Sequence, residues 1–268
     1  MSTAARLSLL VALLAAVGAA SADEAARAAL DRARTLNQGE RHWGDRTQHM
    51  QLTIVDRRGS EYQRELEVRS KRYDGDAVRS LMFFHGPAQV RGIGFLQWTD
   101  PRSDDHQWLW LPALKRVRQI SGGARSESFV GTDFSYEDLA VMAEAVDWQD
   151  DKAASALVGE ETVDGAPCDV IELRPTAGAD VHYATVRLWL ARDDLTVRKF
   201  EFRDAGGALL KTLLLSDVRR EKNIPTARRL EMRNEQTGSR TTVEVTDLRY
   251  DSGLADEEFT QRRLEKGL

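Results

Sequence analysis

Apolar and polar residues alternate along most of the chain, from about Thr47 to Tyr250. A period of two places successive side chains on opposite faces of an extended strand. Clusters of Gly, Asp and Asn interrupt the alternation and supply the residues that tight turns need, as at 58–60 and 164–165. The pattern therefore predicts antiparallel strands at 47–57, 61–72, 77–85, 92–98, 105–111, 115–120, 155–163, 167–175, 181–191, 196–204, 209–219, 225–235 and 240–250.

Three segments have the composition of helices. The segment Asp23 to Leu36 begins with acidic residues and carries Arg near its end, as the helix dipole favours. Ser135 is a good helix-capping residue, and the segment after it combines acidic residues in the first turn with apolar positions at helical spacing. A short final helix is expected over about 255–266, after Gly253.

The alternation also indicates which face of the sheet turns inward. Leu66 and Val68 share one face of their strand, while Glu65, Glu67 and Arg69 occupy the other. An outer-membrane barrel would turn its apolar side chains outward to lipid, whereas the opposite faces here carry charges of both signs and suit water. The sequence therefore predicts a strand-dominated α+β fold, with a curved antiparallel sheet around an apolar interior that is plugged by helices or occupied by a ligand.

The amino-terminal segment has the layout of an export signal. Residues 1–22 contain Arg6, an apolar run and the small residues Ala20-Ser21-Ala22, followed by acidic residues. We expect a signal peptide over 1–22, cleaved after Ala22, and a single domain over 23–268, because no linker, repeat or change of composition divides the rest. The alternative is a membrane anchor, but the apolar run is short against the roughly 20 residues that span a bilayer. The export signal predicts a periplasmic protein. Because no Cys lies near the cleavage site, we expect that it is not a lipoprotein.

Composition excludes several classes of function. The chain has 38 Lys and Arg against 43 Asp and Glu, so it lacks the basic excess that nucleic-acid binding requires. The single Cys168 excludes an internal disulfide framework and CxxC sites, and is expected to be a small buried residue rather than a nucleophile. No catalytic residue, metal site or cofactor is predicted, because no nucleophile elbow occurs and the histidines stand outside metal motifs, at His42, His49, His85, His106 and His182. Asp104-Asp105-x-Gln107, beside His106, has the composition of a metal or acid–base cluster. We expect it in a polar turn before the strand of Trp108, and therefore do not assign it a catalytic role.

Three segments resemble a known family. Residues 95–139 read FLQWTDPRSDDHQWLWLPALKRVRQISGGARSESFVGTDFSYEDL, residues 163–173 read VDGAPCDVIEL, and residues 254–260 read LADEEFT. Over essentially the whole mature chain, the sequence resembles the outer membrane lipoprotein-sorting protein family, which is similar to the periplasmic carrier LolA. The resemblance implies an incomplete, half-open β-barrel of the LolA/LolB type, with helices over its mouth and an apolar cavity for acyl chains. It also implies an RND-type exporter of the inner membrane as a candidate partner.

The inward faces provide the candidate site residues. Apolar and aromatic positions that would line the cavity are Leu66, Val68, Phe83, Phe95, Trp108, Trp110, Leu188, Leu190, Phe200, Phe202, Leu213, Leu230, Met232, Val243 and Val245. The helix after Ser135 is the candidate lid, with Phe134, Tyr136, Leu139 and Met142. Trp108 and Trp110 share one strand face, opposite Leu109 and Leu111, and are suited either to core packing or to ligand contact.

Two polar features also permit two interpretations. Lys115, Arg116 and Arg118 could meet a lipid phosphate or an anionic membrane, or could form a solvated strand face. The loop Ser121-Gly122-Gly123-Ala124 could form an anion-binding nest or a simple hairpin turn.

The predicted function is non-enzymatic. We expect a monomeric periplasmic carrier that binds lipid, lipoprotein acyl chains or another hydrophobic cargo for transfer toward the outer membrane, without nucleic acid as a partner. The alternatives are a lipid-sensing adaptor that binds a partner protein and, less favoured by the sequence, a lipid-metabolising enzyme.

Overall fold

The computed structural model describes residues 23–74, 77–100 and 103–268, so the predicted signal peptide lies outside the described residues. Within the described residues, thirteen strands form one antiparallel sheet. They are β1 (Asp45–Val55), β2 (Glu61–Arg72), β3 (Val78–Gly86), β4 (Gly94–Thr99), β5 (His106–Leu111), β6 (Arg116–Ile120), β7 (Ala153–Val163), β8 (Ala166–Pro175), β9 (Thr185–Ala191), β10 (Val197–Arg203), β11 (Leu209–Glu221), β12 (Ile224–Asn234) and β13 (Arg240–Tyr250).

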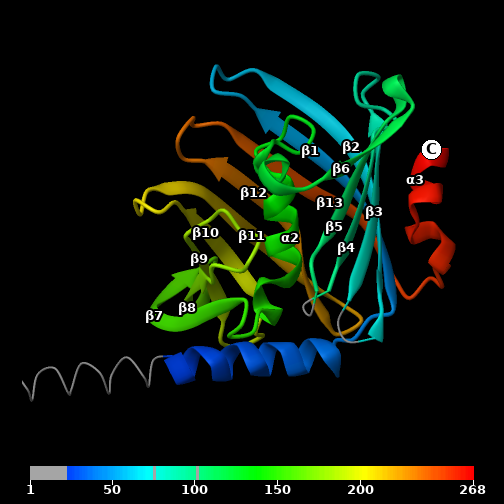
Figure 1. The fold of residues 1–268 in the computed structure, drawn as a ribbon. Helices are drawn as coiled ribbons and strands as arrows, with labels where there is room; N and C mark the ends of the chain where they lie inside the picture. The colour runs from blue at the N-terminus through cyan, green and yellow to red at the C-terminus, as the bar shows by residue number, and fades with distance from the viewer. Residues whose placement is uncertain (1–22, 75–76, 101–102) are drawn as a thin grey trace, which may run out of the picture.

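The sheet is curved and does not close into a barrel (Figure 1). Its strand order is β6-β5-β4-β3-β2-β1-β13-β12-β11-β10-β9-β8-β7, so β6 and β7 form its two edges. Pairing of β1 with β13 joins the two halves of the sheet in the middle. The predicted half-open, strand-dominated fold is confirmed. The thirteen predicted strands all occur, although β9 begins at Thr185 rather than near residue 181.

The helices lie on different faces of the sheet (Figure 1). Helix α2 (Tyr136–Glu144) occupies the concave side, and the N-terminal helix, described over residues 23–38, crosses the lower end of the sheet. The final helical segment is divided by extended Thr260 into η5 (Asp256–Phe259) and α3 (Gln261–Lys266). Both pieces pack on the outer face, which corrects the expectation that all three helical segments plug the interior.

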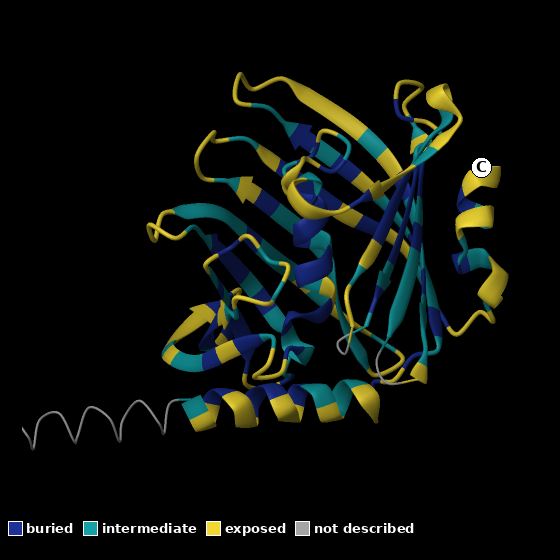
Figure 2. Ribbon diagram, viewed as in Figure 1, coloured by how far each residue is buried: buried dark blue, intermediate teal, exposed yellow. Residues whose placement is uncertain are grey.

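The sheet is covered by apolar clusters on both faces. The largest cluster fills the concave side and joins the strands to α2 and to the N-terminal helix through Leu30 and Val141. A second cluster packs Phe259 and Leu264 against the outer faces of β3, β4 and β5. Figure 2 shows α2 largely buried at the centre, whereas the tips of the long hairpins are exposed. No helix in the described part of the chain is both long and apolar enough to span a membrane.

Candidate functional site

An apolar groove of about 420 Å³ runs along the concave face between the strands and α2. This volume lies within the range of roughly 300–1,000 Å³ that is usual for small-molecule sites. Its strand wall consists of aliphatic, methionine and phenylalanine side chains from seven strands, namely Met50, Leu52, Leu66, Val68, Met82, Phe200, Leu215, Val218, Leu230, Val243 and Val245. Leu139, Met142 and Val146 from α2 and the following turn form the opposite wall. The site therefore suits a long apolar ligand.

Helix α2 begins with a capping box. Ser135 Oγ accepts a hydrogen bond from the Asp138 backbone N–H at 3.1 Å, and Asp138 Oδ2 accepts one from the Ser135 N–H at 2.7 Å. The two bonds satisfy backbone donors that the first helical turn leaves free. The sequence signal at Ser135 is therefore confirmed.

Asp138 also ties α2 to the sheet. Its side chain is fully buried, accepting hydrogen bonds from Tyr183 Oη at 2.6 Å and from Lys211 Nζ at 2.6 Å. A buried carboxylate without such partners would cost several kcal/mol, so these contacts fix the helix over the groove. Burial beside the carboxylate also raises the pKa of the Tyr183 phenol.

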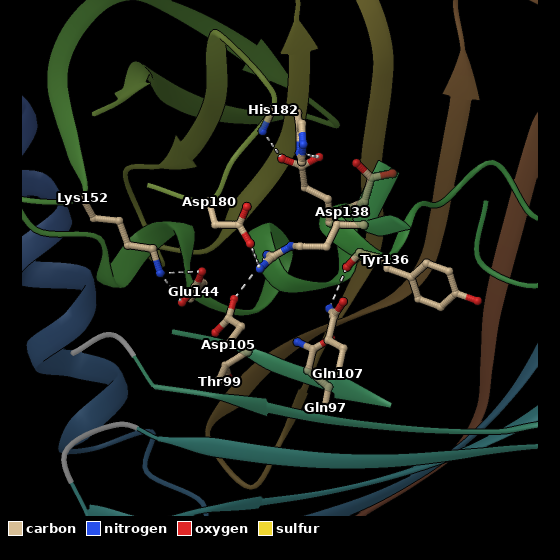
Figure 3. Close-up of polar contacts among 12 residues, drawn as sticks. Gln97, Thr99, Asp105, Gln107, Tyr136, Asp138, Glu144, Lys152, Asp180 and His182 are labelled. Carbon is tan, nitrogen blue, oxygen red and sulfur yellow. Dashed lines mark hydrogen bonds and ion pairs between the residues drawn. The ribbon is translucent and has the colours of Figure 1, made fainter. Parts of the chain in front are cut away.

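Figure 3 shows further charged contacts along α2. Glu144 accepts two hydrogen bonds from Lys152 Nζ, each 2.9 Å long. Glu137 lies 3.3 Å from His182 Nδ1 and accepts a hydrogen bond from the His182 backbone, and burial raises the pKa of its carboxyl group. The helix thus turns Leu139 and Met142 toward the groove, and Glu137 and Glu144 toward neighbouring loops.

Asp105 belongs to the same polar cluster. Its side chain is 3% exposed and lies 3.5 Å from Arg125 Nη2, while Arg125 also pairs with Asp180 at 3.1 Å. Burial, together with the nearby charge of Glu144, raises the pKa of Asp105 to about 7. Asp105 lies in the loop before β5, as the sequence predicts, but its side chain is buried beside Glu144 of α2, which the sequence did not indicate. No local signal distinguishes it from exposed Asp104.

The loop before α2 is fastened to β13. Asp133 accepts hydrogen bonds from Ser239 Oγ and from Thr241 Oγ1, the latter at 2.7 Å, and its backbone N–H donates to Thr241 Oγ1 at 2.9 Å. Gln107 Nε2 donates to the Tyr136 carbonyl oxygen at 2.8 Å from the opposite half of the sheet. Both halves of the curved sheet therefore hold α2, the candidate lid.

The predicted site residues fall into three groups. Those at the groove are Leu66, Val68, Phe200, Leu230, Val243 and Val245 from the strands, and Phe134, Leu139 and Met142 from the lid segment. Those buried in the concave core, without lining the groove, are Phe95, Leu188, Leu190, Phe202, Leu213 and Met232. Tyr136 joins this core group, with its ring centroid 5.4 Å from that of Phe95.

Phe83, Trp108 and Trp110 form the third group and do not line the groove. They lie on the outer face of β3 and β5, where Phe83 and Trp108 are buried with Phe259 and Leu264 of the C-terminal segment. Strand alternation placed the two tryptophans on one face, as observed, but assigned that face to the cavity. The C-terminal helix instead provides an apolar cover outside, so the packing interpretation of the tryptophans is correct.

The remaining candidates from the sequence are the basic residues near β6, the Gly122–Gly123 loop and Cys168, and all of them lie away from the apolar groove. Lys115, Arg116 and Arg118 lie on or beside edge strand β6 with exposed side chains, and Arg118 pairs with Glu127 at 3.0 Å. The Gly122–Gly123 loop opens a 3-10 helix (Gly122–Ser126) rather than a hairpin turn. Cys168 is 1% exposed, and burial raises the pKa of its thiol.

A larger hollow, of about 650 Å³, lies over the outer faces of β12 and β13. Its charged side chains pair with one another, as Arg229 does with Glu244 at 2.7 Å and Arg233 with Glu231 at 2.6 Å. This hollow is therefore a solvated charged surface, unlike the apolar groove. Among residues 23–74, 77–100 and 103–268, no group of three or more His, Cys, Asp or Glu side chains is arranged to hold a metal ion.

An open antiparallel sheet curved around an apolar groove, with a helix inside, defines a half-barrel of the LolA type. A LolA superfamily protein from Nitrosomonas europaea shares this fold at 19% identity, with a TM-score of 0.66 over 89% of this chain and 98% of its own. No curated protein sequence matches the chain.

Closer similarity identifies the family. A domain from Vibrio parahaemolyticus assigned to the outer membrane lipoprotein-sorting proteins is 30% identical, with a TM-score of 0.82 over 91% of this chain and 99% of its own. A DUF1329 family protein from Desulfovibrio piger is also 30% identical, with a TM-score of 0.81 over 89% and 98% of the two chains. A family model described as an uncharacterized protein matches residues 76–266. The chain belongs to the outer membrane lipoprotein-sorting family of the Vibrio domain.

Proposed function

We propose that the protein is a non-enzymatic periplasmic carrier that binds the acyl chain of a lipid or a similar hydrophobic cargo in the groove under α2. The observation that carries the proposal is the continuous apolar wall from β10 to β3, facing Leu139 and Met142 of the lid. Residues 23–268 act as one ligand-binding domain. Transfer toward the outer membrane and cooperation with an RND-type exporter are the extensions of this proposal that the family resemblance supports.

Transfer free energy explains why such cargo needs a carrier. Each methylene buried from water contributes about 0.8 kcal/mol, so a chain of about 15 methylenes carries roughly 12 kcal/mol. A carrier must match much of this value and still release its load. Methionine side chains at Met50, Met82 and Met142 suit that requirement, because their flexible thioethers adapt to irregular ligands.

Neighbouring residues on β11 provide a direct test. Leu215 lines the groove, whereas the next residue, Ser216, points to the outer face opposite Arg229 of β12. Leu215→Glu places an unpaired carboxylate in the groove and should weaken binding of a fluorescent fatty acid at least tenfold, since burying a charge without a partner costs several kcal/mol. Binding is measured by fluorescence titration.

Ser216→Glu is the matched control, because it adds the same side chain one position away on the other face. It should bind the probe as tightly as the parent. Thermal melting establishes that both variants are folded. Equal binding by the parent and by folded Leu215→Glu would overturn the assignment of the groove as the ligand site.

A further inference from the structure

One end of the apolar groove is cationic. Arg41, Arg46 and Arg72 line it together with Trp43 and Tyr250, at the beginning of β1 and the end of β2. The guanidinium carbon atoms of Arg46 and Arg72 lie 4.6 and 4.8 Å from the centroid of the Trp43 ring. The indole therefore holds two cations at the same end of the groove.

No carboxylate lines this groove among the residues that the structure describes. This is notable in a chain with 43 acidic against 38 basic residues. Elsewhere, acidic partners neutralise buried or half-buried arginines, as Asp194 does for Arg198 at 2.6 Å. Arg41 lies near the Asp194 carboxylate, which stands outside the groove lining, whereas no carboxylate acts on Arg46 among the described residues.

The guanidinium of Arg46 has an unsatisfied hydrogen-bond donor. Its Nε atom is buried without a hydrogen-bond partner, and within the described residues no carboxylate acts on the charge of its guanidinium. Burial lowers the pKa of Arg46, partly offset by the phenol of Tyr250, but an arginine remains charged at neutral pH. A half-buried guanidinium with an unsatisfied donor is stabilised by an anion that enters beside it.

We propose that the cargo is an anionic amphiphile whose acyl chain lies along the groove and whose carboxylate or phosphate head group is bound by Arg46, with Arg41 and Arg72 beside it. The inference rests on the proposed carrier function and specifies its ligand class. Acyl chains linked only through ester, amide or thioether bonds carry no charge and would bring no counterion to Arg46. Charge complementarity therefore favours a free fatty acid or an anionic phospholipid.

The test compares two probes of equal chain length, cis-parinaric acid and its methyl ester, which differ in one negative charge. The protein should bind the acid at least tenfold more tightly than the ester. Arg46→Gln should reduce that preference to about one by weakening binding of the acid alone, and Arg46→Lys should restore most of it. Arg249→Gln is the matched control, since the Arg249 side chain is 67% exposed on β13 and pairs with Asp247; it should keep the preference.

Each outcome separates the ligand class from the carrier function. Equal binding of acid and ester by the parent, or an unchanged preference in folded Arg46→Gln, would overturn the anionic head group and leave the carrier function standing. Failure of both probes to bind would overturn both proposals. If Arg46→Gln does not fold, loss of the acid preference of the parent at high salt supports the inference, and a salt-independent preference contradicts it.

Competition against bound cis-parinaric acid distinguishes the two sources of the anionic group. Stronger displacement by oleate than by lysophosphatidylglycerol identifies a carboxylate ligand, and the reverse order identifies a phosphate ligand. Either order supports the inference, provided that neutral monoacylglycerol competes at least tenfold less well. Monoacylglycerol that competes as well as both anions would contradict it.

Discussion

Asp105 shows how a tertiary contact changes the chemistry of one residue. The carboxyl group is covered by α2 and faces Glu144 of that helix, Lys152 after it, Arg125 of the 3-10 helix Gly122–Ser126 and Asp180 of the β8–β9 loop. Burial is the largest cause of its raised pKa, and the cations of Lys152 and Arg125 offset only part of that effect. The folded protein therefore binds a proton at Asp105 that the unfolded chain has released by about pH 4.

The raised pKa predicts how stability depends on pH. Because the folded state binds the proton more tightly, the contribution of Asp105 to the free energy of unfolding is greatest below about pH 4, and it falls until the pH passes about 7. Asp105→Asn removes this dependence. Relative to the parent, the variant should gain on the order of 2 kcal/mol between pH 5 and pH 8, measured by urea unfolding.

Asp104→Asn is the control, since Asp104 precedes Asp105 and is exposed. It should follow the parent across this pH range. A parallel curve for Asp105→Asn would show that Asp105 titrates as an ordinary surface carboxylate.

At the scale of elements, the lid helix is positioned by charge as well as by apolar packing. Asp138 and Glu144 are both buried on α2, yet each reaches a lysine from another part of the chain, Lys211 of β11 and Lys152 respectively. A helix fastened in this way keeps Leu139 and Met142 over the groove. In the carrier that we propose, release of cargo requires these contacts or the Asp133 contacts to β13 to open.

Lys211→Met should destabilise the protein by on the order of 3 kcal/mol, because it leaves the fully buried Asp138 carboxylate without its cation. Lys222→Met removes a lysine whose side chain is 63% exposed and pairs with Asp251, so its cost should stay below about 1 kcal/mol. Urea unfolding of the two variants measures the difference. Similar small losses for both would mean that the Lys211 contact does not hold the lid.

The strands illustrate what alternation can and cannot predict. It placed Leu230 and Phe202 on the inner face correctly, but Phe202 is fully buried between neighbouring residues while Leu230 lines the groove. A charge introduced at Phe202 would therefore test folding before it tested binding. How far an inner-face side chain is buried depends on which segment packs against it. Phe202 is covered by Tyr183, whose ring centroid lies 4.8 Å from that of Phe202.

At the scale of the whole molecule, the open sheet leaves β6 and β7 as edges. The charged residues of β6 suit an edge that must not pair with another chain.

The periplasmic carrier that we propose must also be exported. The pattern of residues 1–22 predicts cleavage after Ala22, so protein recovered from the periplasmic fraction should begin at Asp23 when its amino terminus is sequenced.

A variant with Ala20→Leu and Ala22→Leu removes the small residues of the predicted cleavage site and should retain Met1. Intact parent protein in washed membranes, with Met1 at its amino terminus, would contradict the predicted signal peptide.

The sequence by itself determined the number of the strands and their order along the chain, which side chains share a face within each strand, and the cap of α2 at Ser135. These features depend on neighbours a few residues apart, through strand alternation, turn residues and helix capping. The resemblance of three segments led to the correct family and fold.

Only the tertiary structure decided which apolar residues form a site. Trp108 meets α3 from the far end of the chain, Asp105 meets α2, and Arg46 meets Trp43 at the end of the groove. Apolar and charged side chains are suited equally to packing, to ion pairs and to ligand binding. Their role is decided by which distant segment covers them, because burial and the local dielectric depend on that contact and on no pattern within a single strand or helix.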